Sequence, residues 1–530
     1  MSHLKFKERK TKMAEHSFDE ISRQIVDEYL RDIVFIDEKA YQSDDGDNSF
    51  DANAVSNYFT EAGKLCTIYA PVNDTDIDYC VPLASKADVL VVDWRLMLKN
   101  TKPVDPDADA PDDIRGEHTL KLLHCVLEEA KDDKFKVIVI YTGEEDLGTV
   151  YDNLCAELRT DSLVSHQETF SLSSKNVEIV VRAKKPFQHK PDWDKFVILY
   201  ENLPNEIVSI FTQKIKGLLP NFALRAITEI RNSTSKILGV FSKDLDPAFL
   251  GHYVSIPDCN DTFPVLSKAF GTAVTNLINT SGLVDESWIE KWIDDNIKER
   301  VINICGKNII CSPENLKKLI KSTETFETKY NESFGVDVKN QYAADSYKRK
   351  TTDLFCPHNS DLSNYKWSRL LQYNNLFSSP KVHRLTLGTI VKYKENAEAA
   401  WQYLLCIQQR CDSVRISAQE ERTFLFLPLV KGIKGEAVVV GENDHYIVNN
   451  KTYSIESHKF SPKVNEAFIA SQPIENNEYV FQDKNGINYI WVAELNEMFA
   501  QSIVSAYASQ LSRVGIDNSE WMRLVGKTNK

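Results

Sequence analysis

Short runs of apolar residues recur along the first third of the chain, and each gives way abruptly to polar residues. The runs are four to six residues long, rich in Val and Ile, and occupy positions 33–36, 65–70, 89–92, 137–141 and 177–181. Continuous apolar runs of this length are typical of strands that are covered on both faces. The pattern therefore predicts five buried strands.

Between these runs the apolar positions recur with helical spacing, at 54–63, 118–130 and 145–158. Strands that alternate with helices predict an α/β fold with a doubly wound, parallel five-stranded sheet. In such sheets the chemistry lies just beyond the carboxyl ends of the strands. The residues that follow the apolar runs are therefore the candidates for a functional site.

The pattern changes after about residue 190. Helical spacing covers 203–240 and 263–322, and Ser312 followed by Pro313 is a helix-start signal. Strand patterns begin near residue 385, and Asn485-Gly486 predicts a type I′ hairpin turn. A closing helix is predicted over 495–514. The strand patterns occupy 385–394, 403–407, 424–427, 437–440, 445–448 and 479–492, and the closing helix has Phe499, Ile503, Tyr507 and Leu511 suited to one buried face.

The composition is that of a globular protein, and a chain of 530 residues is too long for one hydrophobic core. A formal net charge of −14 and a pI near 5.4 argue against binding to a nucleic-acid backbone. The chain opens without a signal peptide, has no apolar stretch long enough to span a membrane, and carries ten cysteines with no CxxC pair. These features predict a cytoplasmic protein with reduced thiols.

Acidic residues follow two of the predicted strands. Asp37 and Glu38 come after the first run, and Asp93 comes after the third. Phosphoryl transfer to a carboxylate requires a nucleophilic aspartate and a divalent cation that is held by further carboxylates. Mg2+ prefers such hard oxygen ligands. We therefore expect a Mg2+ site formed by Asp37, Glu38, Asp93 and the backbone carbonyl of Arg95, with Asp93 as the nucleophile.

A hydroxyl and a lysine complete this set. Thr142 follows the fourth run, and Lys185, directly before Pro186, follows the fifth. An acyl phosphate needs a hydrogen-bond donor and a cation for its oxygens, and these two residues supply them. Lys184 is the alternative to Lys185, and the proline favours Lys185.

The segments "VFIDE", "VLVVDW", "VIVIYTGE" and "VVRAKKPF" resemble, in this order, the receiver domains of bacterial response regulators. The resemblance implies a two-component phosphorelay in which Asp93 accepts a phosphoryl group from a histidine-kinase-like ATPase in trans. The chain departs from the family in insertions at 43–51, 99–115 and 160–176. It also has Arg182 where the family usually carries an aromatic residue, three positions before the lysine.

These patterns divide the chain into an N-terminal helical extension (1–24), a receiver domain with insertions (25–192), a helical connector (200–380), a β-rich domain (381–495) and a C-terminal helix with a tail (496–530). The strands of "LGTIVKYK", "YLLCIQQRCD" and "FLFLPL" resemble SH3-like barrels that accompany receiver-like proteins in bacterial defence islands. The resemblance implies an interaction module and a role in an anti-phage or stress system.

Several alternatives stay open. The helical connector fits a dimerisation bundle or a helix-turn-helix, and the C-terminal region fits a protein partner or a homo-oligomer. The receiver is either phosphorylated or a degenerate pseudo-receiver that serves as a scaffold. The sequence shows no familiar catalytic motif after residue 200. We therefore predict a protein that is not an enzyme beyond phosphotransfer onto Asp93, with an effector enzyme of unrecognised active site as the remaining alternative.

Overall fold

The computed structural model consists of two compact units. The first contains Met1–Glu299 and Ser312–Ile320, and the second contains Arg300–Cys311 and Lys321–Lys530. The described residues are 16–41, 50–98, 116–130, 135–158, 163–184, 191–256, 262–283, 286–338, 341–356, 358, 360–377, 382–396, 398–418, 420–432, 436–441, 444–463, 466–474 and 478–512.

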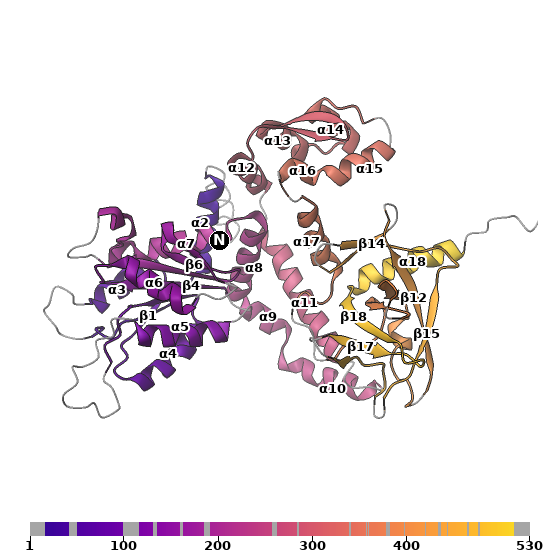
Figure 1. Ribbon diagram of the computed structural model, residues 1–530, viewed down its shortest axis with the longest axis horizontal. Coiled ribbons are helices and arrows are strands. Elements are labelled where there is room, and N and C mark those ends of the chain that lie inside the picture. The colour runs from indigo at the N-terminus through magenta and orange to yellow at the C-terminus, as the bar shows by residue number, and fades with distance from the viewer. Residues whose placement is uncertain are drawn as a thin grey trace, which may run out of the picture. The chain divides into compact units, whose positions relative to one another are not determined.

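The first unit is built around a seven-stranded sheet of order β2-β1-β3-β4-β7-β6-β5 (Figure 1). The five strands from β2 to β7 in this order are parallel, as predicted. They are β1 (Asp32–Ile36), β2 (Leu65–Tyr69), β3 (Val89–Val92), β4 (Lys136–Thr142) and β7 (Val177–Ala183). The predicted insertion at 160–176 adds two antiparallel strands, β5 (Val164–His166) and β6 (Ser171–Ser173).

Helices cover both faces of the parallel strands, which explains why the runs are apolar throughout. On one face, Leu90 and Ile138 pack with α4 (Asp74–Lys86), α5 (Glu117–Ala130) and α6 (Leu147–Leu158). On the other face, Val91 and Val139 pack with α2 (Phe18–Tyr29), α3 (Ala52–Glu61) and α7 (Leu203–Ile215). The predictions of α3, α5 and α6 are confirmed, whereas α4 was not expected.

The α/β fold extends beyond the predicted limit at residue 192, because α7 contributes Leu203, Ile207 and Phe211 to the core on one face of the sheet. Helix α8 (Leu218–Asn232) is joined to α2, where Asn221 donates to the Ser22 hydroxyl at 2.8 Å. The unit continues with α9 (Thr234–Val240), α10 (Asp246–Ser255), α11 (Thr262–Ser281) and α12 (Glu286–Asn296), then α13 (Pro313–Lys321), which Ser312 caps as predicted.

The second unit begins with a hairpin where helical spacing was predicted. Strands β8 (Arg300–Ile304) and β9 (Lys307–Cys311) pair across a two-residue turn at Cys305-Gly306. Both turn residues have positive φ, 52° and 79°, which is the type I′ geometry that matches strand twist. The helical prediction for this part of 263–322 was wrong, because the turn and the β-branched residues around it favour a hairpin. Four helices follow, α14 (Phe326–Phe334), α15 (Gln341–Lys350), α16 (Thr352–Phe355) and α17 (Ser360–Gln372).

An antiparallel sheet of nine strands forms the rest of the second unit and confirms the β-rich prediction. Its inner positions alternate between two cores. Ile390 and Leu405 pack with Ile503 of the closing helix, whereas Val391 and Leu404 pack on the opposite side. The strand pairing does not establish a closed barrel, so the SH3-like barrel stays a prediction. The elements are β10 (Thr389–Tyr393), β11 (Gln402–Cys406), β12 (Arg422–Val430), β13 (Ala437–Val440), β14 (Asp444–Val448), β15 (Glu456–Phe460), β16 (Gln472–Pro473), β17 (Tyr479–Gln482), β18 (Asn488–Glu494) and α18 (Glu497–Leu511).

Two local predictions in this unit need correction. The hairpin at Asn485-Gly486 exists, but of these two residues only Gly486 has a positive φ, so the turn is not type I′. The Gly486 amide instead donates to the Asp483 carbonyl at 3.1 Å, and Asp483 donates to Ile487, which gives a longer loop that ends in a left-handed glycine. In α18, Leu511 is 56% exposed, so the buried face of the helix ends at Tyr507 instead of Leu511.

None of the described helices is both long enough and apolar enough to cross a lipid bilayer.

Candidate functional site

The strand register brings the predicted site residues to one edge of the parallel sheet. Ile36 is paired with Val92, and Val92 with Ile140, so Asp37 and Asp93 follow neighbouring strands at the same level. Thr142 is the last residue of β4 and is paired with Ala183 of β7. The carboxyl ends of β1, β3, β4 and β7 therefore meet where doubly wound sheets bind their ligands.

Three carboxylates converge at this edge. Each of Asp37, Glu38 and Asp93 offers an oxygen, and these oxygens lie within 4.8 Å of one another. Asp37 is fully buried and Asp93 is 7% exposed. The backbone fixes their positions: the Asp93 amide donates to the Ile36 carbonyl at 3.0 Å, and the Thr119 hydroxyl donates to the Asp93 carbonyl at 2.8 Å.

The lysine that reaches the carboxylates is Lys184. Its Nζ lies 2.6 Å from Oδ2 of Asp37 and 2.6 Å from Oδ2 of Asp93. The Lys184 amide donates to the Thr142 carbonyl at 2.7 Å, which continues the ladder between β4 and β7 by one residue. Lys185, which the following proline favoured, lies outside the described residues.

Aromatic rings line the other side of the Lys184 ammonium. Nζ lies 5.7 Å from the ring centre of Phe50 and 6.0 Å from that of Tyr141. Tyr200 stands edge-on to both rings, each at 5.7 Å between ring centres. These three rings thus form an aromatic cluster beside the ion pairs of Lys184. None of these rings was predicted to belong to the site, although Tyr141 directly precedes Thr142.

Crowding of like charges shifts the pKa values at this edge. Burial, together with the charges of Asp93 and Asp37, raises the pKa of Glu38 to about 7. Burial also raises the pKa of Asp93, although Lys184 opposes the rise. For Lys184, burial lowers the pKa, but the attraction of Asp93 and Asp37 outweighs it and the net direction is upward. Lys184 is attracted by two carboxylates, and both favour its charged form. Asp93 is attracted by Lys184 but repelled by Asp37, so its charged form is favoured less.

Thr142 and Arg95 have partners of their own. The buried Thr142 hydroxyl accepts a hydrogen bond from the Glu144 amide at 3.2 Å. The Arg95 guanidinium binds the Glu144 carboxylate through two contacts, 2.6 Å from Nε to Oε1 and 2.8 Å from Nη2 to Oε2. Glu144, which the sequence analysis did not assign, thus connects the segments that follow β3 and β4.

This arrangement has the chemistry of a site for a hard divalent cation. Three carboxylates lie together here, with the Lys184 ammonium in contact with two of them and the charge of Lys39 acting on Glu38 and Asp93. A doubly charged ion would balance the remaining negative charge, and carboxylate oxygens are the ligands that Mg2+ and Ca2+ accept. Asp37, Glu38 and Asp93 are therefore the residues that could hold such an ion.

A protein-family model described as a response receiver domain matches residues 29–188. Residues 29–188 form a response receiver domain. The chain gives no significant match to a curated protein or to a solved structure. The match includes every residue that the sequence placed at the site, and it ends before α7, which completes the core of the receiver domain.

The receiver domain gives Arg182 a partner away from the acidic cluster. Its Nε lies 2.8 Å from Oε1 of Glu206 on α7, and its Nη1 donates to the Thr169 carbonyl at 3.3 Å. Arg182 is only 11% exposed at its side chain. The charge at this position therefore joins β7 to α7.

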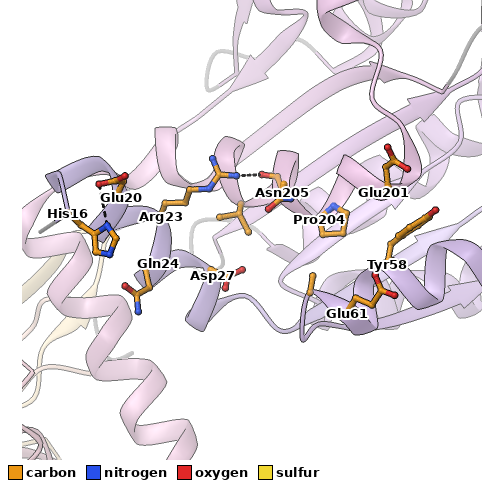
Figure 2. A pocket seen from close by; sticks show the side chains of 12 residues that line it. His16, Glu20, Arg23, Gln24, Asp27, Tyr58, Glu61, Glu201, Pro204 and Asn205 are labelled. Atoms are coloured by element: carbon orange, nitrogen blue, oxygen red, sulfur yellow. Dashed lines mark hydrogen bonds and ion pairs between the residues drawn. The ribbon is translucent and has the colours of Figure 1, made fainter. Parts of the chain in front are cut away.

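A separate hollow of about 690 Å³ lies between α2, α3 and the start of α7 (Figure 2). Its walls carry the carboxylates of Glu20, Asp27, Glu61 and Glu201. Two of these carboxylates have partners within the protein. Glu20 closes the capping box of α2, and Asp27 pairs with Lys64 at 2.8 Å. Arg23 reaches across to the Asn205 carbonyl at 3.2 Å. The Arg23 contact joins α2 to α7, and together these contacts point to a structural role.

Proposed function

We propose that this protein is a response-regulator-like signalling protein whose receiver domain accepts a phosphoryl group on Asp93. The observation that carries the proposal is the position of Lys184, whose Nζ contacts both Asp37 and Asp93 beside the third carboxylate, Glu38. A packing role alone does not explain why three buried carboxylates should gather at the end of a sheet, because their mutual repulsion is costly.

The proposed reaction is a single phosphoryl transfer. An oxygen of the Asp93 carboxylate attacks phosphorus, a P–O bond forms, and the bond from phosphorus to the donor breaks, so that the leaving atom keeps the electron pair. Lys184 then pairs with the new phosphoryl group, which carries more charge than the carboxylate it replaces. The Thr142 hydroxyl at the end of the neighbouring strand serves as the hydrogen-bond donor.

Mg2+ is the proposed cofactor, held by Asp37, Glu38 and Asp93. When bound, it would neutralise charge on the phosphoryl oxygens and orient them for attack. The raised pKa of Glu38 supports this role, because a carboxyl group that resists ionisation beside two others is relieved by a cation. The backbone carbonyl of Arg95 stays the predicted fourth ligand.

The phosphoryl donor is proposed to be a histidine-kinase-like ATPase in trans, in a cytoplasmic phosphorelay. The output is proposed to be recognition by the second unit, with no catalysis beyond the transfer to Asp93. A setting in bacterial defence or stress rests only on the resemblance of the β-rich strands to barrels from defence islands.

The test is to incubate the full chain with acetyl phosphate and Mg2+ and to measure its intact mass. We expect the mass of one phosphoryl group on the wild type and none on Asp93→Asn. Asp88→Asn is the matched control, because Asp88 is a similarly buried carboxylate before β3 instead of after it. An unmodified wild type under these conditions, or equal labelling of the wild type and Asp93→Asn, would contradict the proposal and favour a pseudo-receiver.

A further inference from the structure

Residues 197–202, which lead into α7, are attached to the carboxyl edge of the parallel sheet. Val197 pairs in parallel with Ala183, the last residue of β7. The Ile198 amide donates to the Ala183 carbonyl at 2.9 Å, and the Tyr141 hydroxyl of β4 donates to the Ile198 carbonyl. The ends of β4 and β7 therefore hold this segment beside the acidic cluster.

Tyr200 is the first residue of η4 (Tyr200–Asn202), the short 3-10 helix that leads directly into α7. Its ring contacts those of Phe50 and Tyr141 at interplanar angles of 89° and 67°, with 5.7 Å between ring centres in each case. Edge-on pairs of this kind are favourable, because the positive edge of one ring meets the negative face of the other. Phe50 and Tyr141 are also the rings over which the Lys184 ammonium lies. Tyr200 thus packs on both rings that contact this lysine.

Tyr200 adds no charge of its own beside Lys184. Burial raises the pKa of Tyr200 to about 12, although the charge of Lys184 opposes the rise. The charges of Asp37 and Asp93 raise this pKa further. The phenol therefore keeps its proton at neutral pH, and its effect on Lys184 acts through the packing of its ring.

A lysine needs such packing to stay in one place. Its four-carbon stem is flexible, and a side chain loses rotamer freedom when it is fixed. At Lys184 the ion pairs and the attraction to two ring faces oppose that loss. Phe35 and Tyr200 both pack on these two rings. Phe35 is fixed within β1, whereas Tyr200 belongs to the connection to α7, so Tyr200 is the ring through which α7 can act on the site.

We propose that Tyr200 is a positioning residue for Lys184, acting through the two rings between them, and that it couples the acidic cluster to the attachment of α7. The proposal rests on the proposed function, because Lys184 is the residue that pairs with the phosphoryl group. When that group forms on Asp93, the ammonium exchanges a carboxylate partner for the phosphoryl oxygens, and its position over the rings changes. Coupling of this kind is reciprocal, so a change that loosens α7 also weakens the hold on Lys184.

The first measurement is the rate at which acetic anhydride acetylates Lys184 in the full chain, without Mg2+ and without a phosphoryl donor. Tandem mass spectrometry gives this rate as a ratio to that of Lys121, an exposed lysine of α5. Tyr200→Ala should raise the ratio by about tenfold, which is the scale of two lost aromatic contacts. Tyr200→Phe keeps the ring, so its ratio should equal that of the wild type.

Tyr29→Ala is the matched control. Tyr29 is a half-buried tyrosine that packs on the same core as Tyr200 and contacts Phe211 of α7, with 5.7 Å between ring centres. Its ring lies under the Arg231 guanidinium instead of the Lys184 ammonium. This variant removes a comparable contact with α7 and should leave the acetylation ratio unchanged.

Three results of the acetylation experiment overturn the proposal, whether or not Asp93 is phosphorylated. They are an unchanged ratio in Tyr200→Ala, an equal rise in Tyr29→Ala, and a rise in Tyr200→Phe as large as that in Tyr200→Ala.

The second measurement is hydrogen exchange of the α7 amides with and without acetyl phosphate and Mg2+. Phosphorylation should change this exchange in the wild type but not in Tyr200→Ala. A phosphorylated wild type with unchanged exchange of α7 overturns the coupling. A wild type that is not phosphorylated contradicts the proposed function instead, and the acetylation ratios then decide the positioning of Lys184 alone.

Discussion

Two sheets of this protein each carry a cluster of polar side chains, and the clusters differ in how their charges are matched. At the carboxyl edge of the parallel sheet, three carboxylates lie together, and the Lys184 ammonium contacts two of them, Asp37 and Asp93. In the antiparallel sheet, Tyr489, His458 and Glu456 form a chain in which the tyrosine hydroxyl lies 2.9 Å from His458 Nδ1 and Nε2 lies 3.2 Å from Glu456 Oε2. Tyr393 adds a hydrogen bond to Gln402 at 3.0 Å.

The difference separates polar groups that satisfy one another from polar groups that repel one another. In the antiparallel sheet the hydroxyl, imidazole and carboxylate groups alternate as donors and acceptors, so burial is compensated locally. At the parallel edge like charges are forced together, and the pKa of Glu38 rises to about 7. The repulsion destabilises the folded state there, and a bound cation would reduce it.

Removal of Lys184 should produce the largest effect. In Lys184→Met the buried charges of Asp37 and Asp93 lose their common partner, and the free energy of unfolding of the first unit should fall by about 4 kcal/mol. For a domain of this size that corresponds to roughly 8–16 °C in melting temperature. Calorimetry without divalent cations measures the melting temperature. An unchanged melting temperature would show that the ion pairs of Lys184 do not stabilise the first unit.

The pH dependence of the first unit should reflect Glu38. Its pKa is raised from 4.5 to about 7 in the folded state, so the folded chain keeps a proton that the unfolded chain loses. The stability of the folded state should therefore fall as pH rises from about 4.5 to 7, by about 3 kcal/mol in total. Thermal melts at several pH values test this, and Glu38→Gln should flatten the curve.

Mg2+ should compete with the same proton. The rise in melting temperature that Mg2+ produces should grow between pH 6 and 8, because the cation needs the ionised form of Glu38. Glu494→Gln is the control, since Glu494 is a carboxyl group of the second unit whose pKa burial also raises. If Mg2+ stabilised Glu38→Gln as much as the wild type at pH 8, Glu38 would not be a ligand.

Disruption of the chain of Tyr489, His458 and Glu456 should have a smaller effect on stability. His458→Phe leaves the buried Tyr489 hydroxyl without its hydrogen-bond partner on the imidazole, and the second unit should lose roughly 2 kcal/mol. Phosphorylation of Asp93 and the response to Mg2+ should not change. A loss of phosphorylation in His458→Phe would mean that the side chains around His458 influence the acidic cluster at Asp93.

Arg182→Ala should have the smallest effect. It removes the partly buried ion pair with Glu206 and should cost about 1 kcal/mol, while acetyl phosphate should still label Asp93. If labelling were abolished, Arg182 would belong to the site itself. The expected change lies instead in the attachment of α7, which hydrogen exchange of the α7 amides would detect.

The parallel sheet and its acidic edge were predictable because buried strands need apolar side chains on both faces and the polar residues that follow them are few. Lys184 was not preferred to Lys185, since a proline restricts the backbone before it but does not determine which side chain faces the site. The ladder between β4 and β7 decides that, and it depends on pairing between strands far apart in sequence.

Helix α4 escaped prediction for a local reason. Its segment carries Pro82 and alternates acidic with apolar residues, which hides the buried stripe of Ile77, Cys80 and Ala84. The capping box of Asn73 with Asp76 was the available signal. Similarly, the position of α7 on the sheet follows from tertiary packing, so no feature near residue 192 could show that the domain continues.

The most direct test of the central claim is to identify the residue that carries the phosphoryl group. The full chain is treated with acetyl phosphate and Mg2+, the acyl phosphate is reduced with borohydride, and the peptides are sequenced by tandem mass spectrometry. Reduction converts a phosphorylated aspartate into homoserine, so we expect homoserine at position 93 and at no other carboxylate. Homoserine at Asp37 or at a site in the second unit, or none under conditions that reduce a control acyl phosphate, would contradict it.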